Sequence, residues 1–330
     1  MLVPVLLFAL GLVLLIKGGD WFVDGATGIA QRFHVPDLII GATVVSIGTT
    51  LPEVMVSATS ALTGHGEIAY GNAIGSIICN TALIAAITVA VRPCPVDRDS
   101  LKTPVLFFFV SAGIYCLNAY LTGYFSRVLG VVLLLLFAVY MYMTIRQGFR
   151  NPAPGEETDS HPEPDKPGSV GKDILLLVVG AALIAVGANL LVDNGTLIAK
   201  ALGVPESVIA LTFVALGTSL PELVTAITSL IKGHGALSLG NVIGANIFNL
   251  VLVSGVSMAL SPFRIPQSST IGGINASLVL DIPLMLFVMA FLTLPALAKR
   301  KLSRYQGVVL LILYAARYHS SPPAGIWGKG

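Results

Sequence analysis

The chain has 330 residues, of which 55% are hydrophobic and only 11% charged, and its formal net charge is +2. Soluble domains carry about 25% charged residues, so this chain has more apolar surface than one soluble core could bury. The composition therefore indicates a polytopic membrane protein, and the small net charge argues against nucleic acid as a partner. Cys79, Cys94 and Cys116 have neither metal-ligand nor redox spacing, so no disulfide framework is expected.

Apolar stretches long enough to cross about 30 Å of hydrocarbon recur along the chain. The first has no basic residue before it and no convincing cleavage site after it, so we interpret it as a membrane span and not as a signal peptide. We predict ten membrane helices, at 2–29, 38–62, 68–91, 104–121, 125–146, 173–199, 207–231, 237–260, 271–293 and 303–318.

The segment between the fifth and sixth predicted helices, residues 147–172, is rich in proline and acidic residues. Such a segment cannot offset its ordering entropy by burial, so we predict a disordered linker, and residues 319–330 are expected to form an exposed tail. If both termini lie outside (periplasmic), thirteen Lys and Arg residues fall on the side of the linker and five on the other. This bias places the linker in the cytoplasm.

An internal repeat is the strongest signal in the sequence. A shift of 169 positions aligns 21–93 with 190–262 without a gap, and 29 of the 73 positions are identical. The chain thus divides into a first repeat, 1–146, with its motif at 41–93, and a second repeat, 173–318, with its motif at 210–262. Because each repeat has five helices, the second must cross the membrane in the opposite direction. Inverted repeats are typical of secondary transporters, which bind substrate near the midplane where the repeats meet.

The predicted fold class is therefore an all-α polytopic membrane protein, with ten transmembrane helices in two inverted five-helix repeats. Both repeats place Leu-Pro-Glu within an apolar helix, at 51–53 and 220–222. Proline lacks an amide hydrogen and crowds the preceding turn, so we expect broken second and seventh helices with free carbonyl oxygens. Oxygen donors of this kind suit a hard cation. The oxygen donors expected at the two breaks are the side chains of Glu53, Glu222, Thr49 and Thr218 and the backbone carbonyls near Ser46 and Ala215.

Polar side chains in the following helices extend this set. Asn72, Ser76 and Asn80 recur every four residues and form one stripe, which Asn241 and Asn249 repeat in the second copy. The stripe has two interpretations, as cation ligands or as contacts between helices.

Other polar residues have structural interpretations. A single Pro-Glu pair could be a kink with a protonated acid, but two matched copies favour function because an intramembrane acid is costly. Lys17 is expected to snorkel or to pair locally. Interface, capping or turn roles are favoured for Asp20, Asp24, Asp193, Asp281, His65 and His234.

Charge arithmetic points to the ion. Two glutamates neutralise one Ca²⁺, which prefers six to eight oxygens, whereas Mg²⁺ is dehydrated reluctantly. Two or more Na⁺ ions could occupy the same oxygens, and competition for one ligand set is the simplest basis for exchange. Anionic substrates fit poorly because no paired arginines lie at the breaks. The chain has no phosphate-binding Gly-Lys motif, so we expect no use of ATP and no enzyme activity.

The segments GTTLPEVMVSATSALTGHGEIAYGNAIGSIICN and GTSLPELVTAITSLIKGHGALSLGNVIGANIFN resemble the two alpha-repeats of the calcium/cation antiporter superfamily. The similarity is to the sodium/calcium exchanger family and its short bacterial inner-membrane members. It implies ten helices, four central cation sites and sliding of the first and sixth helices. The ligands that this resemblance implies are Glu53, Glu222, Thr49, Thr50, Thr218, Ser219, Ser76, Asn80 and Asn249, with backbone carbonyls near Ser46 and Ala215.

Two departures from the family pattern affect this site. Asn249 stands where some members have an acid, and Ala245 stands where the first repeat has Ser76, so the ion stoichiometry does not carry over. We predict a Na⁺/Ca²⁺ antiporter of the inner membrane, without cofactor or obligate protein partner. A Ca²⁺/H⁺ antiporter that uses the same glutamates and a cation channel remain alternatives, and K⁺ dependence stays open.

Overall fold

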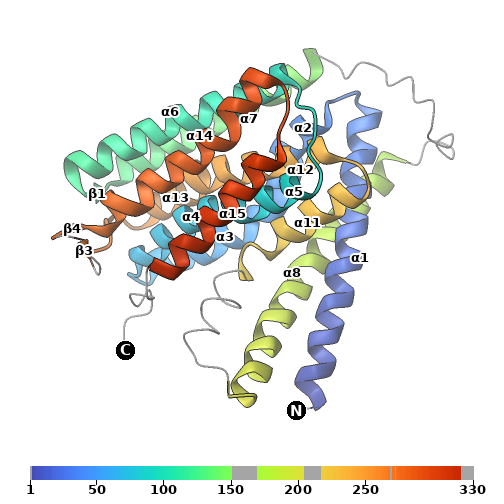
Figure 1. Cartoon of the computed structure of the whole chain (residues 1–330), viewed down its shortest axis with the longest axis horizontal. Coiled ribbons are helices and arrows are strands. Elements are labelled where there is room, and N and C mark those ends of the chain that lie inside the picture. The colour runs from blue at the N-terminus through green and yellow to red at the C-terminus, as the bar shows by residue number, and fades with distance from the viewer. Residues whose placement is uncertain (1, 151–168, 204–216, 268–269, 272, 321–330) are drawn as a thin grey trace.

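The computed structural model describes residues 2–150, 169–203, 217–267, 270–271 and 273–320, and these are almost entirely helical (Figure 1). The first repeat contains α1 (Leu2–Arg32), α2 (Asp37–Ile40), α3 (Ser46–Leu62), α4 (Gly66–Cys79), α5 (Ala86–Val91), α6 (Arg98–Thr122) and α7 (Arg127–Arg150). The second contains α8 (Val170–Ala201), α11 (Leu220–Ile231), α12 (Gly235–Phe248), α13 (Ser254–Leu260), α14 (Ile282–Lys299) and α15 (Arg304–Ser320). Among the described residues, π-helical segments join several of them: η1 (Gly41–Val45), η2 (Asn80–Ala85), η4 (Asn249–Val253) and η5 (Ser277–Asp281).

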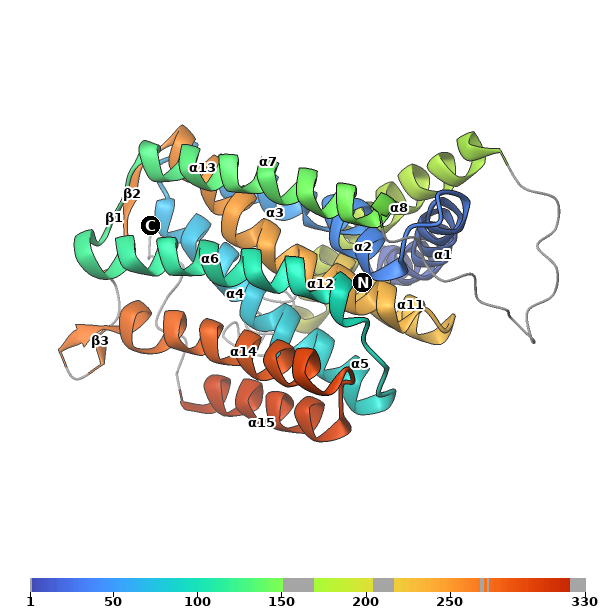
Figure 2. The same ribbon diagram turned by 90° about the horizontal axis from the view of Figure 1, so that it is seen from above.

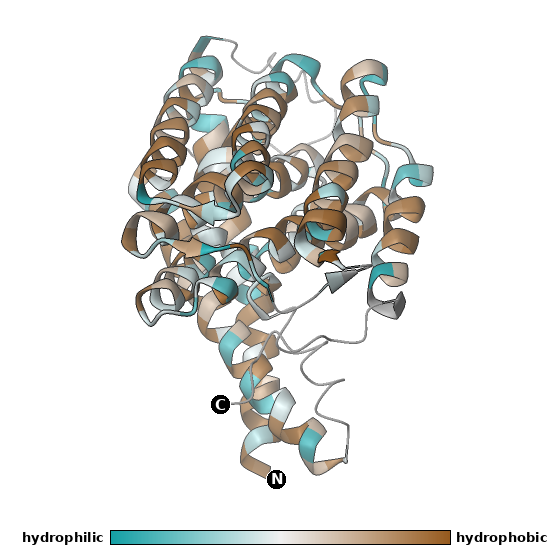
Figure 3. Ribbon diagram, turned by 90° about the vertical axis from the view of Figure 1, so that its left-hand side faces the viewer, coloured by the Kyte–Doolittle hydropathy of each residue, from teal (hydrophilic) through white to brown (hydrophobic). Residues whose placement is uncertain are grey.

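Eight helical segments in the described part of the chain are long and apolar enough to cross a membrane. They correspond to eight of the ten predicted spans, and Figure 3 shows them as largely hydrophobic ribbons with hydrophilic residues near many ends. The described α11 has only 12 residues and α15 has 17, so both are shorter than the shortest of the eight, Ser277–Lys299, which has 23. The fold is thus that of a multi-pass helical membrane protein.

The two longest helices, α1 and α8, pack side by side and project from the rest of the protein (Figure 1). Glycines spaced seven residues apart allow this close approach. A Cβ atom on Gly11 would lie 2.9 Å from the carbonyl oxygen of Gly187, and one on Gly18 would lie 2.9 Å from that of Gly180. Small residues of this kind let membrane helices approach backbone to backbone. At the end of the pair, Arg32 Nη2 lies 3.0 Å from Asp173 Oδ2.

The centre of the protein is α12, in which every residue from Leu237 to Phe248 is buried. It packs against α2, η1, α3 and α11, and also against α6. Figure 2 shows α6, α7, α14 and α15 running alongside one another as an outer layer. This arrangement surrounds the motif helices α3, α4, α11 and α12 with apolar helices.

The predicted break in the second helix is wrong, because the chain stays helical from Asp37 to Leu62 with Pro52 inside α3. A π-helical turn, Gly41–Val45, precedes α3 instead. Ser46 Oγ donates to the carbonyl oxygen of Gly41 at 2.8 Å. This bond satisfies the Gly41 carbonyl within the π-turn, and α3 continues through Pro52, as membrane helices tolerate proline when their surroundings satisfy the freed backbone groups.

The second copy differs at the corresponding position. Thr218 and Ser219 form a turn, and α11 begins at Leu220 with Pro221 in its first turn, where a missing amide hydrogen costs nothing. The helix predicted at 207–231 is therefore interrupted at these two residues. Residues 204–216 lie outside the described part of the chain.

The ends of the predicted linker 147–172 are helical, which corrects its boundaries. Helix α7 extends to Arg150, and α8 begins at Val170, where the Ser169 side chain accepts a hydrogen bond from the Gly171 amide at 3.1 Å. Residues 151–168, and residues 321–330 of the predicted tail 319–330, lie outside the described part.

Two short antiparallel strand pairs were not predicted. Strand β1 (Tyr124–Phe125) pairs with β2 (Phe263–Arg264), and β3 (Thr270–Ile271) pairs with β4 (Ile274–Asn275). The second pair replaces the start of the helix predicted at 271–293, which begins only at Ser277.

Candidate cation site

Two carboxylates from different repeats lie in the interior of the helix bundle. Glu53 on α3 and Glu222 on α11 are both 0% exposed, and α3 and α11 pack against each other. Thr50, three residues before Glu53 on α3, donates a hydrogen bond to the Glu222 carboxylate, which places the two acids in one region. Two buried carboxylates near one another are costly unless a cation or a proton compensates them.

Buried polar atoms without a hydrogen-bond partner among the described residues gather around these carboxylates. Each such atom costs about 1–3 kcal/mol, so a concentration of them in one place calls for a ligand. Their elements are in contact, since α3 packs against α11 and η4, and α11 packs against η2. They include both oxygens of Glu53, Oε2 of Glu222, Oδ1 and Nδ2 of Asn80, Oδ1 of Asn249 and Oγ of Ser219.

The chemistry of this donor set fits a hard cation. Carboxylate, amide and hydroxyl oxygens are the ligands that Ca²⁺ takes, and they also suit Na⁺. The described residues contain no group of three or more His, Cys, Asp or Glu side chains that could hold a metal ion. Among the described residues, the acidic side chains at this site are therefore Glu53 and Glu222.

Threonine hydroxyls connect the two repeats at the site. Thr50 Oγ1 donates to Glu222 Oε1 at 3.5 Å, so a hydroxyl of the first repeat contacts the carboxylate of the second. Thr49 Oγ1 donates to Asn241 Oδ1 at 3.2 Å, and Thr218 Oγ1 donates to Asn72 Oδ1 at 3.4 Å. The site is thus built across the contact between the repeats.

The remaining predicted residues lie in or beside this region. Ser76 is buried on α4 one turn before Asn80, and Asn249 begins η4 as Asn80 begins η2. Ser46 is fully buried, but its hydroxyl already donates to backbone oxygens, including that of Asn241 at 3.0 Å. Ala215 lies outside the described residues.

The predicted ligand set omitted three polar residues that the structure places close to it. Asn72 and Asn241 belong to the polar stripes and bond the threonines beside the glutamates. Thr225 is fully buried, and its hydroxyl has no partner among the described residues. Its position three residues after Glu222, on the same helical face, was the available sequence signal.

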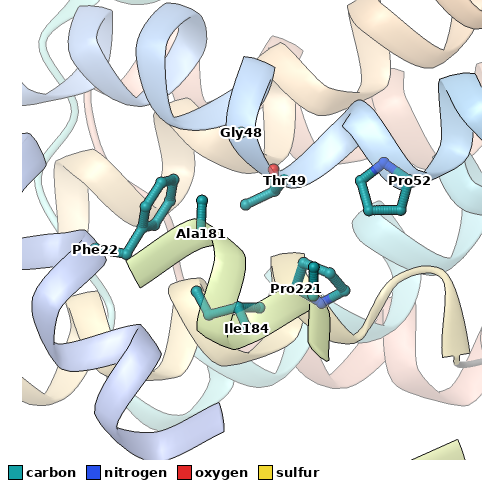
Figure 4. Close-up of a pocket in the computed structure, with 8 residues that line it drawn as sticks. Phe22, Gly48, Thr49, Pro52, Ala181, Ile184 and Pro221 are labelled. Carbon is teal, nitrogen blue, oxygen red and sulfur yellow. The ribbon is translucent and has the colours of Figure 1, made fainter. Parts of the chain in front are cut away.

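A small pocket lies between the long helix pair and the motif helices (Figure 4). Figure 4 shows Phe22 of α1 opposite Gly48 and Thr49 of α3. A Cβ atom on Gly48 would lie 2.9 Å from the Phe22 ring, so a larger residue there would require the ring to shift. The pocket thus reaches one of the predicted ligands, Thr49. Its lining residues are Phe22, Gly48, Thr49, Pro52, Ala181, Ile184, Ala185 and Pro221.

The other acidic residues considered from sequence lie elsewhere. Asp20 and Asp24 contact Lys232, and Asp281 pairs with Arg317 at the end of α15. His234 Nδ1 lies 2.9 Å from Asp37 Oδ2, so this histidine makes a contact beyond its turn. These contacts confirm the interface roles predicted for Asp20 and Asp24 and the end-of-helix contact predicted for Asp281.

In this protein, apolar helices enclose a buried cluster of oxygen donors. The fold and the site are therefore those of a membrane protein that binds cations within the bilayer. The chain belongs to the sodium/calcium exchanger protein family, which matches residues 3–146 and 172–317.

Relatives of known sequence match almost the full chain. An uncharacterized membrane protein of Methanocaldococcus jannaschii is 35% identical, over 93% of this chain and 94% of its own. The putative antiporter CaxA of Alkalimonas amylolytica is 34% identical, over 95% and 97%. The sodium/calcium exchanger MaX1 of Methanosarcina acetivorans is 32% identical, over 94% and 96%.

The fold also matches solved structures. The sodium-calcium exchanger NCX_Mj, soaked with Na⁺ and Sr²⁺, superposes with a TM-score of 0.78 and is 33% identical, over 97% of this chain and 99% of the other. The family and these structures together support cation exchange involving Ca²⁺ and indicate a transporter. The sodium/calcium exchanger resemblance predicted from the motifs is confirmed.

Proposed function

We propose that this protein is a secondary-active antiporter that exchanges Na⁺ for Ca²⁺ across the membrane by alternating access. In this proposal α11 and α15 join the eight long helical segments to give ten membrane crossings in two inverted five-helix repeats. The protein lies in the inner membrane of the cell. Both termini are on the periplasmic side, and the segment between α7 and α8 is on the cytoplasmic side. The protein acts as a transporter and not as an enzyme. It needs no cofactor and no obligate protein partner.

One observation carries the proposal. Buried oxygen atoms without partners in the described residues come from both repeats, on elements that contact α3 or α11, and they include those of Glu53 and Glu222 themselves. In this site the two carboxylates hold the cation, and Thr49, Thr50, Thr218, Ser219, Ser76, Asn80 and Asn249, with backbone carbonyls near Ser46 and Ala215, complete its shell.

Charge balance explains why such a site would exchange ions. With both glutamates ionised and no cation bound, the site holds two uncompensated negative charges in an apolar surrounding, so rearrangement of the helices is unfavourable. One Ca²⁺ cancels both charges, and so do two Na⁺ ions. Because the two cations compete for the same oxygens, each crosses only when the other has left.

The names of relatives support the same ions. MaX1 is named a sodium/calcium exchanger, and NCX_Mj is a sodium-calcium exchanger whose structures were soaked with Na⁺, Ca²⁺ or Sr²⁺. A Ca²⁺/H⁺ antiporter is the second candidate, because a carboxylate binds a proton as well as a metal ion and CaxA is named only as an antiporter.

Uptake of calcium-45 by sealed vesicles that contain the purified protein tests the proposal. The membrane potential is held at zero by valinomycin with equal K⁺ on both sides. An outward Na⁺ gradient should then drive Ca²⁺ uptake. Uptake driven only by a pH gradient would establish the Ca²⁺/H⁺ exchanger instead. Uptake that needs neither counter-ion would indicate a channel and overturn the proposal.

A further inference from the structure

Two hydrogen bonds at the site are related to each other by the sequence repeat. Thr49 Oγ1 donates to Asn241 Oδ1 at 3.2 Å, and Thr218 Oγ1 donates to Asn72 Oδ1 at 3.4 Å. Thr49 corresponds to Thr218, and Asn72 corresponds to Asn241, at the offset of 169 residues. Each bond therefore joins a threonine of one repeat to an asparagine of the other, and the second bond is the symmetry equivalent of the first.

The partners of the Asn72 amide fix which of its atoms faces the threonine. Asn72 Nδ2 donates to Ser57 Oγ at 2.8 Å and to the carbonyl oxygen of Glu53 at 3.3 Å. Its Oδ1 is thereby turned toward Thr218. Asn241 is the repeat equivalent of Asn72, and its Oδ1 is the atom that accepts from Thr49 Oγ1. At Asn72 the assignment of oxygen and nitrogen follows from the partners of Nδ2, and at Asn241 it follows from this equivalence.

An amide oxygen only accepts hydrogen bonds, so each threonine has to donate its single proton to it. The proton then points away from the rest of the site, and the lone pairs of the hydroxyl oxygen remain for another partner. A hydroxyl coordinates a cation through these lone pairs, whereas a proton aimed at the cation would repel it. Thr49 lies one helical turn before Glu53 on the same face of α3, and Thr218 lies four residues before Glu222, in the turn that precedes α11.

We propose that Asn72 and Asn241 are positioning residues for cation binding. Each one orients the hydroxyl of the threonine in the opposite repeat, Thr218 or Thr49, so that its oxygen accepts the cation. The inference rests on the proposed function for the ion that is bound. It replaces the interpretation of these asparagines as simple contacts between helices, which predicts a loss of stability without a specific loss of cation affinity.

Paired substitutions separate the two interpretations. Asn72→Ala and Asn241→Ala remove the acceptor, while Thr49→Val and Thr218→Val remove the hydroxyl with little change of shape. Partners that orient metal ligands typically change affinity by 10–100-fold, so each single variant should raise the half-saturating Ca²⁺ concentration about tenfold or more. The maximal rate should change less, because the carboxylates remain.

The symmetry of the site supplies the control. In the bonded pairs, Asn241→Ala with Thr49→Val and Asn72→Ala with Thr218→Val, the double variant should bind Ca²⁺ about as well as the threonine variant alone. In the crossed pairs, Asn241→Ala with Thr218→Val and Asn72→Ala with Thr49→Val, the fold-changes should multiply. Multiplication in all four pairs, or equal non-additivity in all four, would overturn the inference.

Direct Ca²⁺ binding by calorimetry on the purified protein in detergent repeats the same comparison without transport. If the wild type binds Ca²⁺ with pair-specific coupling but shows no Na⁺-driven uptake, the proposed function fails and the positioning role stands. If the wild type exchanges ions but the coupling is absent, only the positioning role fails. Should an alanine variant not fold, as judged by gel filtration, Asn72→Ser and Asn241→Ser take its place and are subject to the same criterion.

Discussion

Lys232 Nζ lies 2.7 Å from Oδ1 of Asp24 and donates to the backbone oxygen of Asp20 at 3.0 Å. The end of α11 is thus tied to α1, the helix that packs along α8. The corresponding residue of the first repeat, Thr63, is uncharged, and the hydrogen bonds described for its hydroxyl are to Thr59, Ser60 and His65. The two repeats therefore differ in the contacts made at the ends of the corresponding helices α3 and α11.

Lys232→Gln should alter the balance between the two access states more than it alters stability. Because the Asp24 side chain is 53% exposed, the ion pair should contribute less than about 1 kcal/mol to unfolding. A shift of that size between two access states changes their ratio by up to about fivefold. The half-saturating Ca²⁺ concentration should then change in opposite directions in right-side-out and inside-out vesicles. Equal changes on both faces would contradict this, and the exchange Asp24→Lys with Lys232→Asp should restore the wild-type values.

Glu53→Gln and Glu222→Gln should each abolish ion exchange while the protein stays folded. Each substitution removes one of the two charges that neutralise the cation and also relieves repulsion between buried acids, so thermal stability without Ca²⁺ should be unchanged or higher. The rise in melting temperature that Ca²⁺ produces in the wild type should disappear. Glu67→Gln, at the exposed start of α4, is the matched control and should keep both properties. Ca²⁺ flux retained in both site variants would refute the site.

Gly18→Ala should destabilise the protein through the contact of α1 with α8. The new Cβ atom would lie 2.9 Å from the Gly180 carbonyl oxygen and from the Ile184 amide nitrogen, which are backbone atoms that cannot move independently. Overpacking of this kind costs about 1–3 kcal/mol. At Gly113 in α6 no described atom lies within 4 Å of the added Cβ, so Gly113→Ala should be neutral or slightly stabilising. Thermal unfolding in detergent compares the two variants, and equal stability of both would contradict the close packing.

Asp97→Ala should weaken the start of α6 in a pH-dependent way. Partial burial acts to raise the pKa of Asp97, but hydrogen bonds from Ser100 and the Asp99 amide, together with the Arg300 charge, outweigh it and lower the pKa below 3.8. A lowered pKa in the folded state means that the stabilisation is complete above pH 3.8 and is lost as the pH falls through the folded-state value. Near neutral pH the variant should lose about 1 kcal/mol, as for other helix caps. The free energy of unfolding should be measured for the wild type and the variant from neutral pH to about pH 3. The difference between the two proteins should shrink only in the acid range, and a difference that stays constant would exclude the Asp97 charge as its origin.

Several features of the protein followed from the sequence alone. The ten apolar stretches predict helices, and the structure has eight of them as long apolar segments within the described residues, because burial in a bilayer requires uninterrupted helices of this length. The duplicated Leu-Pro-Glu motif singled out Glu53 and Glu222, since an acid within an apolar helix is costly wherever it lies in the fold. Such signals are local, so periodicity and spacing could reveal them.

Only the tertiary structure decided how these local features combine. Proline chemistry alone predicted a break at Pro52, but in the packed protein the chain stays helical from Asp37 to Leu62. The bonds from Thr49 to Asn241 and from Thr218 to Asn72, and the contact of Lys232 with α1, each join residues more than 140 positions apart. No periodicity within one helix encodes such contacts, because they depend on which helix faces come together when the two repeats pack.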